Sequence, residues 1–476
     1  MSLSLSDIKH TKILATIGPA TDDPKILEEI IKSGVNACRM NFSHGNEEER
    51  LAQIKNIREI SARLGRKIAI LQDLQGPKIR LGQLKDDMKF DIKEGDEIGL
   101  TYEIEHDGGN NLPSQYDLSE KCGIGDTIFL FDGKIKLIVE RIEGKTVWSR
   151  ANNSGWVISR KSINLPDMRG SHKDILTEKD LADLEWGIDK DFDYIALSFV
   201  HHADDVRYLR EILKSKGCDR PIITKVETKT AILPENLEEI VKASDGIMVA
   251  RGDLATEAGP EVVPVAQRRM LQLCQKHCKF SIVATQMLGS MVDSPQPTRA
   301  EVSDIATAVI DGSDAVMLSE ETAMGNYPID AVKTMDSVIR FSQDNWPVNP
   351  LFEREGSDER RDAIAESAAK LAEQVEADAI VVETTTGKMA RNIAVRRPNI
   401  TIIAVAPTER VANQMGLLFA TRAFVGAHGE GVDVAKKLFS DGFFGKSTAK
   451  VVIVRRDDGV DDQIANTIQL QVFGEE

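Results

Sequence analysis

Short apolar runs alternate with longer amphipathic stretches along most of the chain. Eight of these runs are rich in Ile, Val and Ala, and they cover residues 11–17, 36–42, 67–73, 193–199, 221–227, 245–251, 280–286 and 314–319. Such runs are typical of parallel strands that are buried on both faces. Because a helix-like stretch follows most of them, the pattern predicts eight strand–helix units, the number found in a (β/α)8 TIM barrel.

Helix boundaries are visible in the same pattern. Residues 46–65 begin with acidic side chains and end with basic ones, which suits the dipole of a helix. Residues 298–312 begin with a threonine that can cap a helix, and they end on glycine. These two stretches are therefore predicted to be helices of the barrel.

Residues 77–175 interrupt the third unit with a different pattern. Asp-Gly and Glu-Gly pairs separate short alternating runs, such as residues 127–133 and 135–144. This pattern predicts a small β-barrel domain inserted at a βα loop. Because such loops lie over the catalytic face of a barrel, the inserted domain can act as a lid.

The strand–helix pattern restarts after the eighth unit. Residues 328–343 are predicted to close the barrel with a helix, and the charged stretch 353–362 is predicted to be a linker or the exposed start of a helix. The rest of the chain predicts a separate α/β domain with a mostly parallel sheet. The predicted division is a barrel from residues 1–76 and 176–345, a lid from 77–175 and a C-terminal domain from 346–476.

Length and charge narrow the range of functions. The chain has 476 residues, enough for two or three domains, and its 60 basic and 76 acidic side chains give a net charge of −16. This excess of negative charge opposes general binding to nucleic acid or to an anionic membrane, although a local cluster of Lys and Arg can still bind small anions. No apolar stretch approaches 18 residues and no signal peptide is visible, so we expect no membrane span and a cytoplasmic location.

The cysteines do not predict a disulfide scaffold. There are five of them, and none forms a CxxC pair. Cys274, His277 and Cys278 would share one face of a helix and are an alternative set of metal ligands. Residues 271–280 are, however, also typical of an ordinary half-buried helix.

Polar side chains gather at the carboxyl ends of the predicted strands, where TIM barrels carry their catalytic groups. Arg39, Asn41 and Ser43 alternate with apolar residues, so they share one face of the second strand. Other polar residues end the third, fifth, sixth, seventh and eighth strands: Asp73, Lys225, Glu227, Arg251, Gly252, Asp253, Thr285, Gln286, Ser319, Glu320 and Glu321.

Two of these carboxylates, Glu227 and Asp253, end neighbouring strands. They suit Mg²⁺ or Mn²⁺, with substrate oxygens completing the octahedron. Lys225 and Arg39 would then hold an anionic substrate while charge develops on oxygen, either in an enolate or in a phosphoryl group in transfer. The alternative for the two carboxylates is an internal salt bridge to Lys225 or Arg251.

The chain has neither a GxxxxGK[ST] loop nor a kinase-type glycine loop followed by HRD, so a nucleotide would bind elsewhere. Three other functions stay open. One is a metal-dependent pyruvate-enolate lyase or aldolase on a similar barrel, the second is a non-catalytic paralogue, and the third is a nucleic-acid-binding or scaffold protein, which the charge opposes.

Three long motifs are more specific. They are RMNFSHG (39–45), ATQML with PTRAEV (284–302) and DGSDAVMLSEETA (311–323). Through these motifs the chain resembles the pyruvate kinase family over nearly its whole length. The resemblance implies a phosphotransferase of glycolysis that uses Mg²⁺ and converts phosphoenolpyruvate and ADP to pyruvate and ATP. It also implies that the inserted domain is a mobile lid and that the C-terminal domain is regulatory.

The resemblance assigns a role to each matching residue. Glu227 and Asp253 match the carboxylates that hold the divalent cation, and Lys225 and Arg39 match the cations that face the phosphoryl group. Matches to the substrate-carboxylate end are Gly252, Asp253 and Thr285, while Thr285 and Ser319 match the proposed proton relay to the enolate. Matches to the nucleotide-facing positions are Asn41, His44, Arg80 and Lys161.

One departure from the family pattern concerns K⁺. Many members bind K⁺ through positions that match Asn41, Ser43, Asp73 and the carbonyl of Leu74. Those members have Glu where this chain has Lys78, and they have Thr where it has Leu74. The chain thus resembles the K⁺-independent subset, in which the ammonium group of Lys78 would supply the monovalent charge. We therefore predict activity without K⁺.

The C-terminal domain contains a candidate phosphate site for an effector. It comprises three hydroxyls, the backbone N–H groups of a helix start and one ammonium group, from Thr384, Thr385, Thr386, Gly387 and Lys388. A phosphorylated effector, such as a sugar phosphate or a nucleotide, would bind there. An ordinary turn with a capped helix explains the same residues. The family resemblance also predicts a homotetramer.

Overall fold

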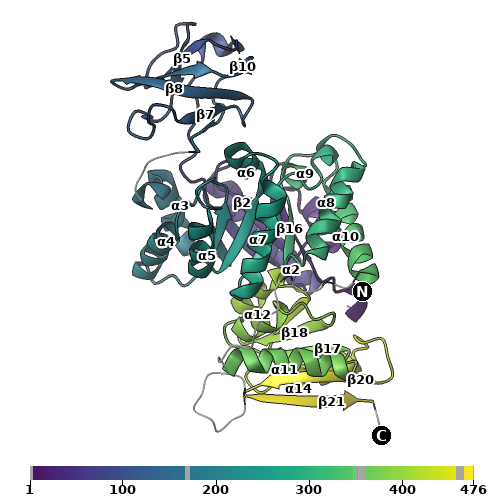
Figure 1. Cartoon of the computed structure of the whole chain (residues 1–476). Helices are drawn as coiled ribbons and strands as arrows, with labels where there is room; N and C mark the ends of the chain where they lie inside the picture. Colours follow the sequence, from purple (N-terminus) through teal and green to yellow (C-terminus); the bar gives the residue numbers. More distant parts are fainter. Residues whose placement is uncertain are drawn as a thin grey trace.

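The structure is a computed structural model and describes residues 4–166, 172–346, 348, 351, 360–456 and 466–474. Three units follow one another along the long dimension of the molecule (Figure 1). The barrel lies in the middle, the inserted β domain lies above it, and the C-terminal domain lies below it. In Figure 1 the N-terminus is marked beside the lower edge of the barrel, near α10, and the C-terminus is marked at the far end of the C-terminal domain.

The central unit is a closed barrel of eight parallel strands, which confirms the predicted TIM barrel. Its strands are β1 (Lys12–Ile17), β2 (Ala37–Asn41), β3 (Ala69–Asp73), β12 (Tyr194–Leu197), β13 (Ile222–Val226), β14 (Gly246–Ala250), β15 (Phe280–Ala284) and β16 (Ala315–Leu318). Among the residues of these strands, only Arg39, Asn41 and Lys225 are not fully buried. The exceptions are thus polar side chains near the carboxyl ends of β2 and β13.

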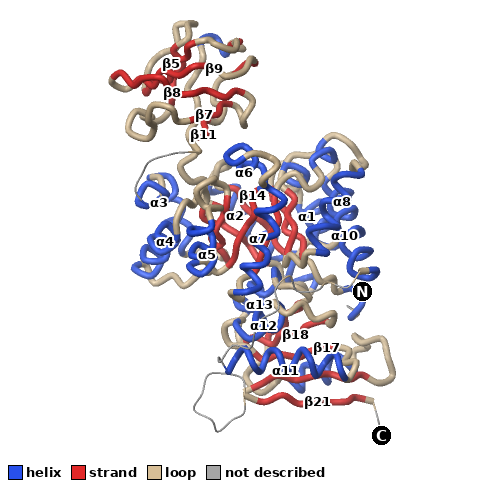
Figure 2. The backbone as a smooth tube through the Cα atoms, in the orientation of Figure 1, coloured by secondary structure: helices blue, strands red, loops and turns tan. Residues whose placement is uncertain are grey.

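Helices surround the ring of strands (Figure 2). They are α1 (Pro24–Lys32), α2 (Glu47–Leu64), α3 (Glu178–Ile188), α4 (Ala203–Ser215), α5 (Pro234–Ala243), α6 (Arg251–Ala258), α7 (Val263–Lys276), α8 (Arg299–Ile310), α9 (Glu320–Ala323) and α10 (Pro328–Asn345). The side chains of Asn46, Thr177 and Thr298 cap α2, α3 and α8 by accepting backbone N–H bonds. The two helices predicted at residues 46–65 and 298–312 are therefore confirmed.

The inserted domain has its own apolar core. Its strands are β4 (Phe90–Ile92), β5 (Glu97–Tyr102), β6 (Asn111–Ser114), β7 (Thr127–Leu130), β8 (Ile135–Glu143), β9 (Thr146–Ala151), β10 (Gly155–Val157) and β11 (Ile163–Asn164). Six of them form a mixed sheet in the order β11-β7-β8-β9-β5-β6, and β10 pairs with β4. This small barrel-like domain fits the predicted lid.

The C-terminal domain is a second α/β unit, as predicted. A five-stranded sheet has the order β19-β18-β17-β20-β21, and only β21 runs antiparallel to its neighbour. Its elements are α11 (Arg360–Gln374), β17 (Ala379–Glu383), α12 (Lys388–Ala394), β18 (Thr401–Ala406), α13 (Glu409–Gln414), β19 (Thr421–Val425), α14 (Gly431–Ser440), β20 (Ala449–Arg455) and β21 (Thr467–Phe473). Most of the predicted linker at 353–362 lies outside the described residues, and the residue boundaries of the three domains stay predictions.

A buried ion pair joins the C-terminal domain to the barrel at the amino-terminal ends of its strands. The Arg397 guanidinium donates to both carboxylate oxygens of Asp314, at 3.2 and 2.8 Å, and neither side chain is more than 1% exposed. The backbone N–H of Phe419 donates to the same carboxylate at 3.0 Å. Because Asp314 directly precedes β16, this contact ties the C-terminal domain to a barrel strand.

Within the part of the chain that the structure describes, none of the helices has the length and apolarity that crossing a bilayer requires.

Candidate active site

Four neighbouring strands bring a charged network to the carboxyl-end mouth of the barrel. Arg39 Nε donates to Asp73 Oδ2 at 2.6 Å, and Lys225 Nζ lies 3.4 Å from Asp73 Oδ1. The Lys225 ammonium also lies 3.0 Å from Glu227 Oε1 and donates to Ser198 Oγ at 2.8 Å. Both cations are almost buried, and such burial is tolerated because each cation has a carboxylate partner.

The network keeps Lys225 charged. Burial alone would lower the pKa of Lys225, but the Asp73 and Glu227 carboxylates raise it above its ordinary value. Burial alone would raise the pKa of Asp73, but the positive charges of Lys225 and Arg39 hold the pKa of this carboxyl below its usual range. A lysine and an arginine are therefore presented as fixed positive charges beside an anion-accepting site.

Glu227 and Asp253, the two predicted ligands of a divalent cation, lie close enough for their charges to interact. The Glu227 carboxylate is 1% exposed and accepts the backbone N–H of Phe199 at 2.7 Å. Burial raises the pKa of Glu227; the Lys225 ammonium opposes the rise, and the Asp253 carboxylate adds to it. Two neighbouring carboxylates that raise the cost of ionisation in this way are a donor set that fits Mg²⁺, a hard cation that prefers oxygen.

Asp253 lies in the first turn of α6 and does not end a strand, so the prediction that residues 251–253 end β14 is wrong. The Arg251 side chain explains the early turn, since it folds back and donates to the Thr285 carbonyl at 2.6 Å. The backbone N–H of Gly252 donates to Thr285 Oγ1 at 2.8 Å. Thr285 itself has φ 69°, a left-handed conformation that apolar periodicity does not predict.

Ser319 follows β16 and lies close to the same mouth. Its Oγ is buried and has no hydrogen-bond partner among the described residues. Its backbone N–H donates to Glu321 Oε2 at 2.6 Å, and the other oxygen of Glu321 accepts the N–H of Leu288 at 3.0 Å. Sequence reasoning did not assign Glu321 a role, but the structure shows that it joins the loops carrying Ser319 and Thr285.

Sequence reasoning also missed Ser198, the partner of Lys225. Its hydroxyl donates to the Leu74 carbonyl at 2.7 Å. The residue directly follows the end of β12, so its position at a strand end could have identified it. It connects the lysine to Leu74, one of the residues that match the monovalent-cation site of the family.

The loop after β2 carries His44 beside several positive charges. Burial lowers the pKa of His44, and the charges of Arg80, Lys78 and Arg39 lower it further. Asn41 Oδ1 accepts the backbone N–H of Ser43 at 3.1 Å, which shapes the start of this loop. The imidazole therefore lies in a cationic environment that favours anionic groups.

A buried arginine of α2 fastens the same loop. One nitrogen of Arg50 donates to the carbonyls of Phe42, His44 and Gly45 at 3.4, 2.9 and 3.4 Å. Its guanidinium carbon lies 3.9 Å from the centre of the Phe42 ring. The ammonium of Lys179 donates to the Phe42 carbonyl as well, at 2.7 Å.

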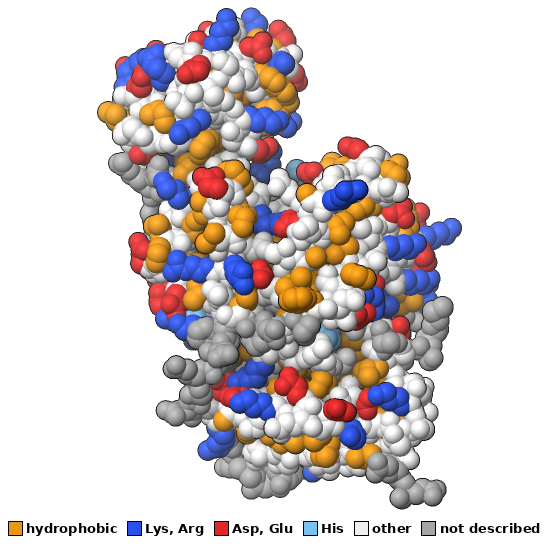
Figure 3. Space-filling view, turned by 45° about the vertical axis from the view of Figure 1, so that its right-hand side comes forward, with side chains coloured by type: hydrophobic (Ala, Val, Ile, Leu, Met, Phe, Trp, Pro, Cys, Tyr) orange, Lys and Arg blue, Asp and Glu red, His pale blue; other side chains and the backbone are white. Residues whose placement is uncertain are grey.

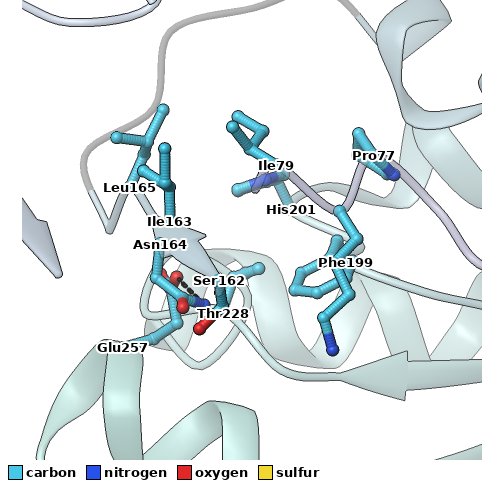
Figure 4. Close-up of a pocket in the computed structure, with 11 residues that line it drawn as sticks. Pro77, Ile79, Ser162, Ile163, Asn164, Leu165, Phe199, His201, Thr228 and Glu257 are labelled. Carbon is cyan, nitrogen blue, oxygen red and sulfur yellow. Dashed lines mark hydrogen bonds between the residues drawn. The ribbon is translucent and has the colours of Figure 1, made fainter. Parts of the chain in front are cut away.

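The lid joins the barrel at a small pocket near α6. In Figure 4, Asn164 at the end of β11 points toward Glu257 of α6, and Asn164 Nδ2 donates to Glu257 Oε1 at 3.2 Å. Phe199 and His201 line the opposite side of this pocket. The space-filling view shows a notch between the lid and the upper rim of the barrel (Figure 3).

Lys161, the fourth residue matched to the nucleotide, belongs to the lid. Its ammonium lies 4.6 Å from the centre of the Phe131 ring. Arg80 lies at the hinge, where it forms a β-bridge with Ser162. The structure thus brings His44 and Arg80 together at the mouth, and Lys161 approaches from above.

The candidate effector residues line an open pocket in the C-terminal domain. The pocket holds about 1240 Å³ of space that is open to solvent. Besides Thr384, Thr385, Thr386 and Lys388, three cationic or titratable side chains line it, from Arg361, His428 and Arg456. Gly387 has φ 78° and starts α12.

The alternative metal set at Cys274 is not supported. Helix α7 ends at Lys276, and Cys278 has φ 51°, so the expectation that the three residues share one helix face is wrong. His277 Nε2 lies 2.8 Å from Glu238 Oε1, and burial raises the pKa of the Cys274 thiol. Among the described residues, no group of three or more His, Cys, Asp or Glu is placed to hold a metal ion.

Known proteins resemble the chain in both sequence and structure. Residues 8–332 match the family description "Pyruvate kinase, barrel domain", and residues 362–470 match "Pyruvate kinase, alpha/beta domain". A protein named pyruvate kinase from Staphylococcus aureus (strain MRSA252) is 39% identical over 428 residues, which cover 88% of this chain and 72% of that relative. One from Sporosarcina psychrophila is 37% identical over 434 residues, with coverages of 90% and 73%.

The similarity extends to a crystal structure of a pyruvate kinase from Cryptosporidium parvum. The two structures superpose with a TM-score of 0.88 at 32% sequence identity. The match covers 98% of this chain and 96% of that one. The likeness therefore includes the barrel, the lid and the C-terminal domain.

Proposed function

The chain belongs to the pyruvate kinase family and is a phosphotransferase, and on this premise we propose that it uses Mg²⁺ to transfer the phosphoryl group of phosphoenolpyruvate to ADP. One observation carries the proposal. Arg39, Asp73, Lys225 and Glu227 form a single charged network, and Asp253 lies close to its acidic end. That network combines fixed cations for a phosphoryl group with carboxylates for a divalent cation.

Glu227 and Asp253 would hold the Mg²⁺. When bound, the ion supplies positive charge to the oxygens of the substrate and so stabilises the negative charge that develops during transfer. The backbone N–H of Phe199 keeps the Glu227 carboxylate oriented toward this position. Lys225 already lies 3.0 Å from Glu227, so the ammonium and the metal carboxylates share one edge of the site.

Arg39 and Lys225 would bind the oxygens of the phosphoryl group. Both cations are held by Asp73, whose carboxylate fixes their positions before substrate arrives. Fixed charges need little reorganisation in the transition state, and this is the main source of their catalytic effect. Asp73 is therefore a positioning residue in the proposal.

Gly252, Asp253 and Thr285 would lie at the carboxylate end of phosphoenolpyruvate. The Thr285 hydroxyl accepts the Gly252 N–H and donates to the Ala284 carbonyl at 2.6 Å. Ser319, whose hydroxyl is buried and unpartnered among the described residues, is the second candidate for moving a proton to the enolate. The proton would pass through water, since no direct contact joins the two hydroxyls in the described hydrogen bonds.

ADP would lie between the barrel and the lid. Asn41, His44 and Arg80 would meet it from the barrel and the hinge, and Lys161 would meet it from the lid. The surrounding charges of Arg80 and Lys78 favour the phosphates of the nucleotide.

We expect this activity to be independent of K⁺. Two oxygens of the predicted monovalent site already accept hydrogen bonds: the Leu74 carbonyl from Ser198, and Asn41 Oδ1 from the N–H of Ser43. The ammonium of Lys78 is close enough to lower the pKa of His44. A fixed ammonium in this region would supply the charge that K⁺ supplies elsewhere in the family.

The pocket at Thr384–Lys388 would bind a phosphorylated effector. Arg361, Lys388 and Arg456 would supply positive charge around the threonine hydroxyls. The test is activity at subsaturating phosphoenolpyruvate with added sugar phosphates or AMP. Lys388→Met should abolish the response and leave the unstimulated rate within about twofold, because the pocket lies in a separate domain. Homotetramer formation and a cytoplasmic location stay predictions.

The decisive experiment is an assay of pyruvate release from phosphoenolpyruvate, ADP and Mg²⁺, with and without K⁺. We expect release that requires ADP and Mg²⁺ and that changes little on addition of K⁺. Release without ADP would instead favour a lyase, and strong activation by K⁺ would contradict the role of Lys78.

A further inference from the structure

A tight turn of the lid, residues 131–134 between β7 and β8, lies beside the hinge. Phe131 and Asp132 both have left-handed backbones, with φ 52° and 54°. The Asp132 N–H donates to Ser162 Oγ at 2.9 Å, and the hydroxyl donates back to Asp132 Oδ1 at 2.7 Å. These bonds fix the turn against the strand segment that carries Lys161.

Two lysines meet over one aromatic ring of this turn. Lys134 Nζ lies 3.7 Å from the centre of the Phe131 ring, and Lys161 Nζ lies 4.6 Å from the same centre. The two distances limit the separation of the two ammonium groups to about 8 Å. Trp156 packs edge-on against Phe131, with the ring centres 5.1 Å apart, and so supports the ring from the lid core.

Neither lysine has an acidic partner. In the part of the chain that the structure describes, no carboxylate lies within 4.0 Å of Lys134 Nζ or Lys161 Nζ, and Asp132 is engaged with Ser162. An aromatic ring only partly balances the positive charge of a lysine above it, since such a contact is worth about 0.5–1 kcal/mol at an exposed site. Two neighbouring ammonium groups without a counter-ion favour an anion with more than one charge.

The turn lies over the helix that begins the substrate site. A Cβ atom at Gly133 would lie 3.3 Å from Thr256 Cγ2, so the lid backbone is in near contact with α6. Glu257 of the same helix accepts the hydrogen bond from Asn164 of the lid. The first turn of α6 carries Gly252 and Asp253, so the lysine pair is placed on the side of the lid that faces the phosphoryl-transfer site.

We propose that Lys134 is a further phosphate-binding residue, which together with Lys161 forms a two-ammonium clamp for the diphosphate of the nucleotide. This inference rests on the proposed function and adds to it a group from the lid. Phe131 holds both lysines at one place, and the turn brings them to the nucleotide from the side opposite His44. Because the clamp contacts ADP alone, it affects the affinity for ADP and leaves phosphoenolpyruvate binding unchanged.

The test is Lys134→Met in the full-length chain, with Lys145→Met as the matched control. Lys145 also lies over an aromatic ring, 4.8 Å from the centre of Tyr102, but it is in the turn at the opposite end of β8. A strand of nine residues spans about 30 Å, so the control lysine is far from the nucleotide. We expect Lys134→Met to raise the KM for ADP about five- to tenfold, the effect of one lost charge-assisted contact.

The KM for phosphoenolpyruvate and the kcat at saturating ADP should stay within about twofold, and Lys145→Met should change nothing. Lys134→Arg should restore most of the affinity, because it keeps the charge. In the Lys134→Met, Lys161→Met double variant, the two effects on the KM for ADP should not simply multiply, since both lysines bind one group. An unchanged KM for ADP in Lys134→Met, or an equal rise for both substrates, would overturn the proposal.

Direct binding of ADP, measured by calorimetry without phosphoenolpyruvate, separates this inference from the proposed function. If the unmodified protein releases no pyruvate, the proposed function fails, and weaker ADP binding by Lys134→Met would still support the clamp. If pyruvate is released but Lys134→Met binds ADP as tightly as the Lys145→Met control does, only the clamp fails. Equal melting temperatures of the three proteins exclude misfolding as the cause.

Discussion

Replacing Arg50 should weaken nucleotide binding indirectly, through the loop that carries His44. Arg50 is 6% exposed, and its guanidinium donates to three carbonyls of the loop that carries His44. Arg50→Met keeps much of the volume of the side chain and removes the charge and the donors. The loop would then lose the arginine that holds His44 in place, while Arg39 in strand β2 would keep its partner Asp73.

The size of the effect follows from the contacts. One of the three hydrogen bonds is well formed at 2.9 Å and two are long at 3.4 Å, so the set is worth about one strong charged bond, roughly 1.5–3 kcal/mol. Two effects reduce this loss: Lys179 still donates to the Phe42 carbonyl, and the variant no longer has the cost of burying a cation. We therefore expect the loop conformation to lose about 1–2 kcal/mol of stabilisation. If that free energy disfavours the binding conformation of the loop, the KM for ADP rises about five- to thirtyfold.

The assay is steady-state pyruvate release at varied ADP and at varied phosphoenolpyruvate. Arg63→Met is the matched control, since Arg63 lies on the same helix but is exposed and pairs only with Glu28 among the described residues. We expect the KM for ADP to rise in Arg50→Met alone, with the KM for phosphoenolpyruvate within about threefold. An unchanged KM for ADP in a folded Arg50→Met variant would refute the reasoning.

Two further predictions concern stability. Arg397→Met should lower the free energy of unfolding by about 3–5 kcal/mol, because it leaves the buried Asp314 carboxylate without its cation; an unchanged urea midpoint would contradict this. Burial lowers the pKa of His10 to about 4, whereas the unfolded chain takes up this proton near pH 6.5, so stability should fall as the pH drops from about 6.5 to about 4. His10→Leu should flatten that part of the pH profile of the melting temperature, and an equal slope in both proteins would show that other groups cause it.

Apolar periodicity was sufficient to predict the barrel. All eight strands fall within the predicted runs, because strands buried on both faces leave little freedom in residue type. Helix starts were equally accessible where a side chain caps them, as at Asn46 and Thr298. The C-terminal α/β domain followed from the same two patterns.

The conformations of the site loops were not predictable in this way. Residues 251–253 are polar and follow an apolar run, yet they start α6, because Arg251 finds its hydrogen-bond acceptors on the neighbouring β15 loop. Thr285 adopts a left-handed backbone for the same tertiary reason. Helix α7 ends at Lys276, and Cys278 beyond it has φ 51°, although the sequence around Cys278 suits a helix.

Candidate site residues could be named from their strand-end positions, but their partners could not. The link from Lys225 through Ser198 to the Leu74 carbonyl crosses three successive barrel strands and joins residues that are 27 and 124 positions apart in the sequence. The role of Glu321 in joining two loops has the same origin. The predicted barrel indicates which strands are neighbours, but local sequence patterns do not indicate which side chains form hydrogen bonds across them.

The central claim is that Lys225, fixed between Asp73 and Glu227, stabilises the phosphoryl group while it moves. The most direct measurement is the kcat and the phosphoenolpyruvate affinity of Lys225→Met, with Lys229→Met, an exposed lysine four residues further along the chain, as the control. The account predicts that kcat falls by about 10²–10³ while the dissociation constant of phosphoenolpyruvate changes less than about tenfold. Full turnover in a folded Lys225→Met protein would contradict it.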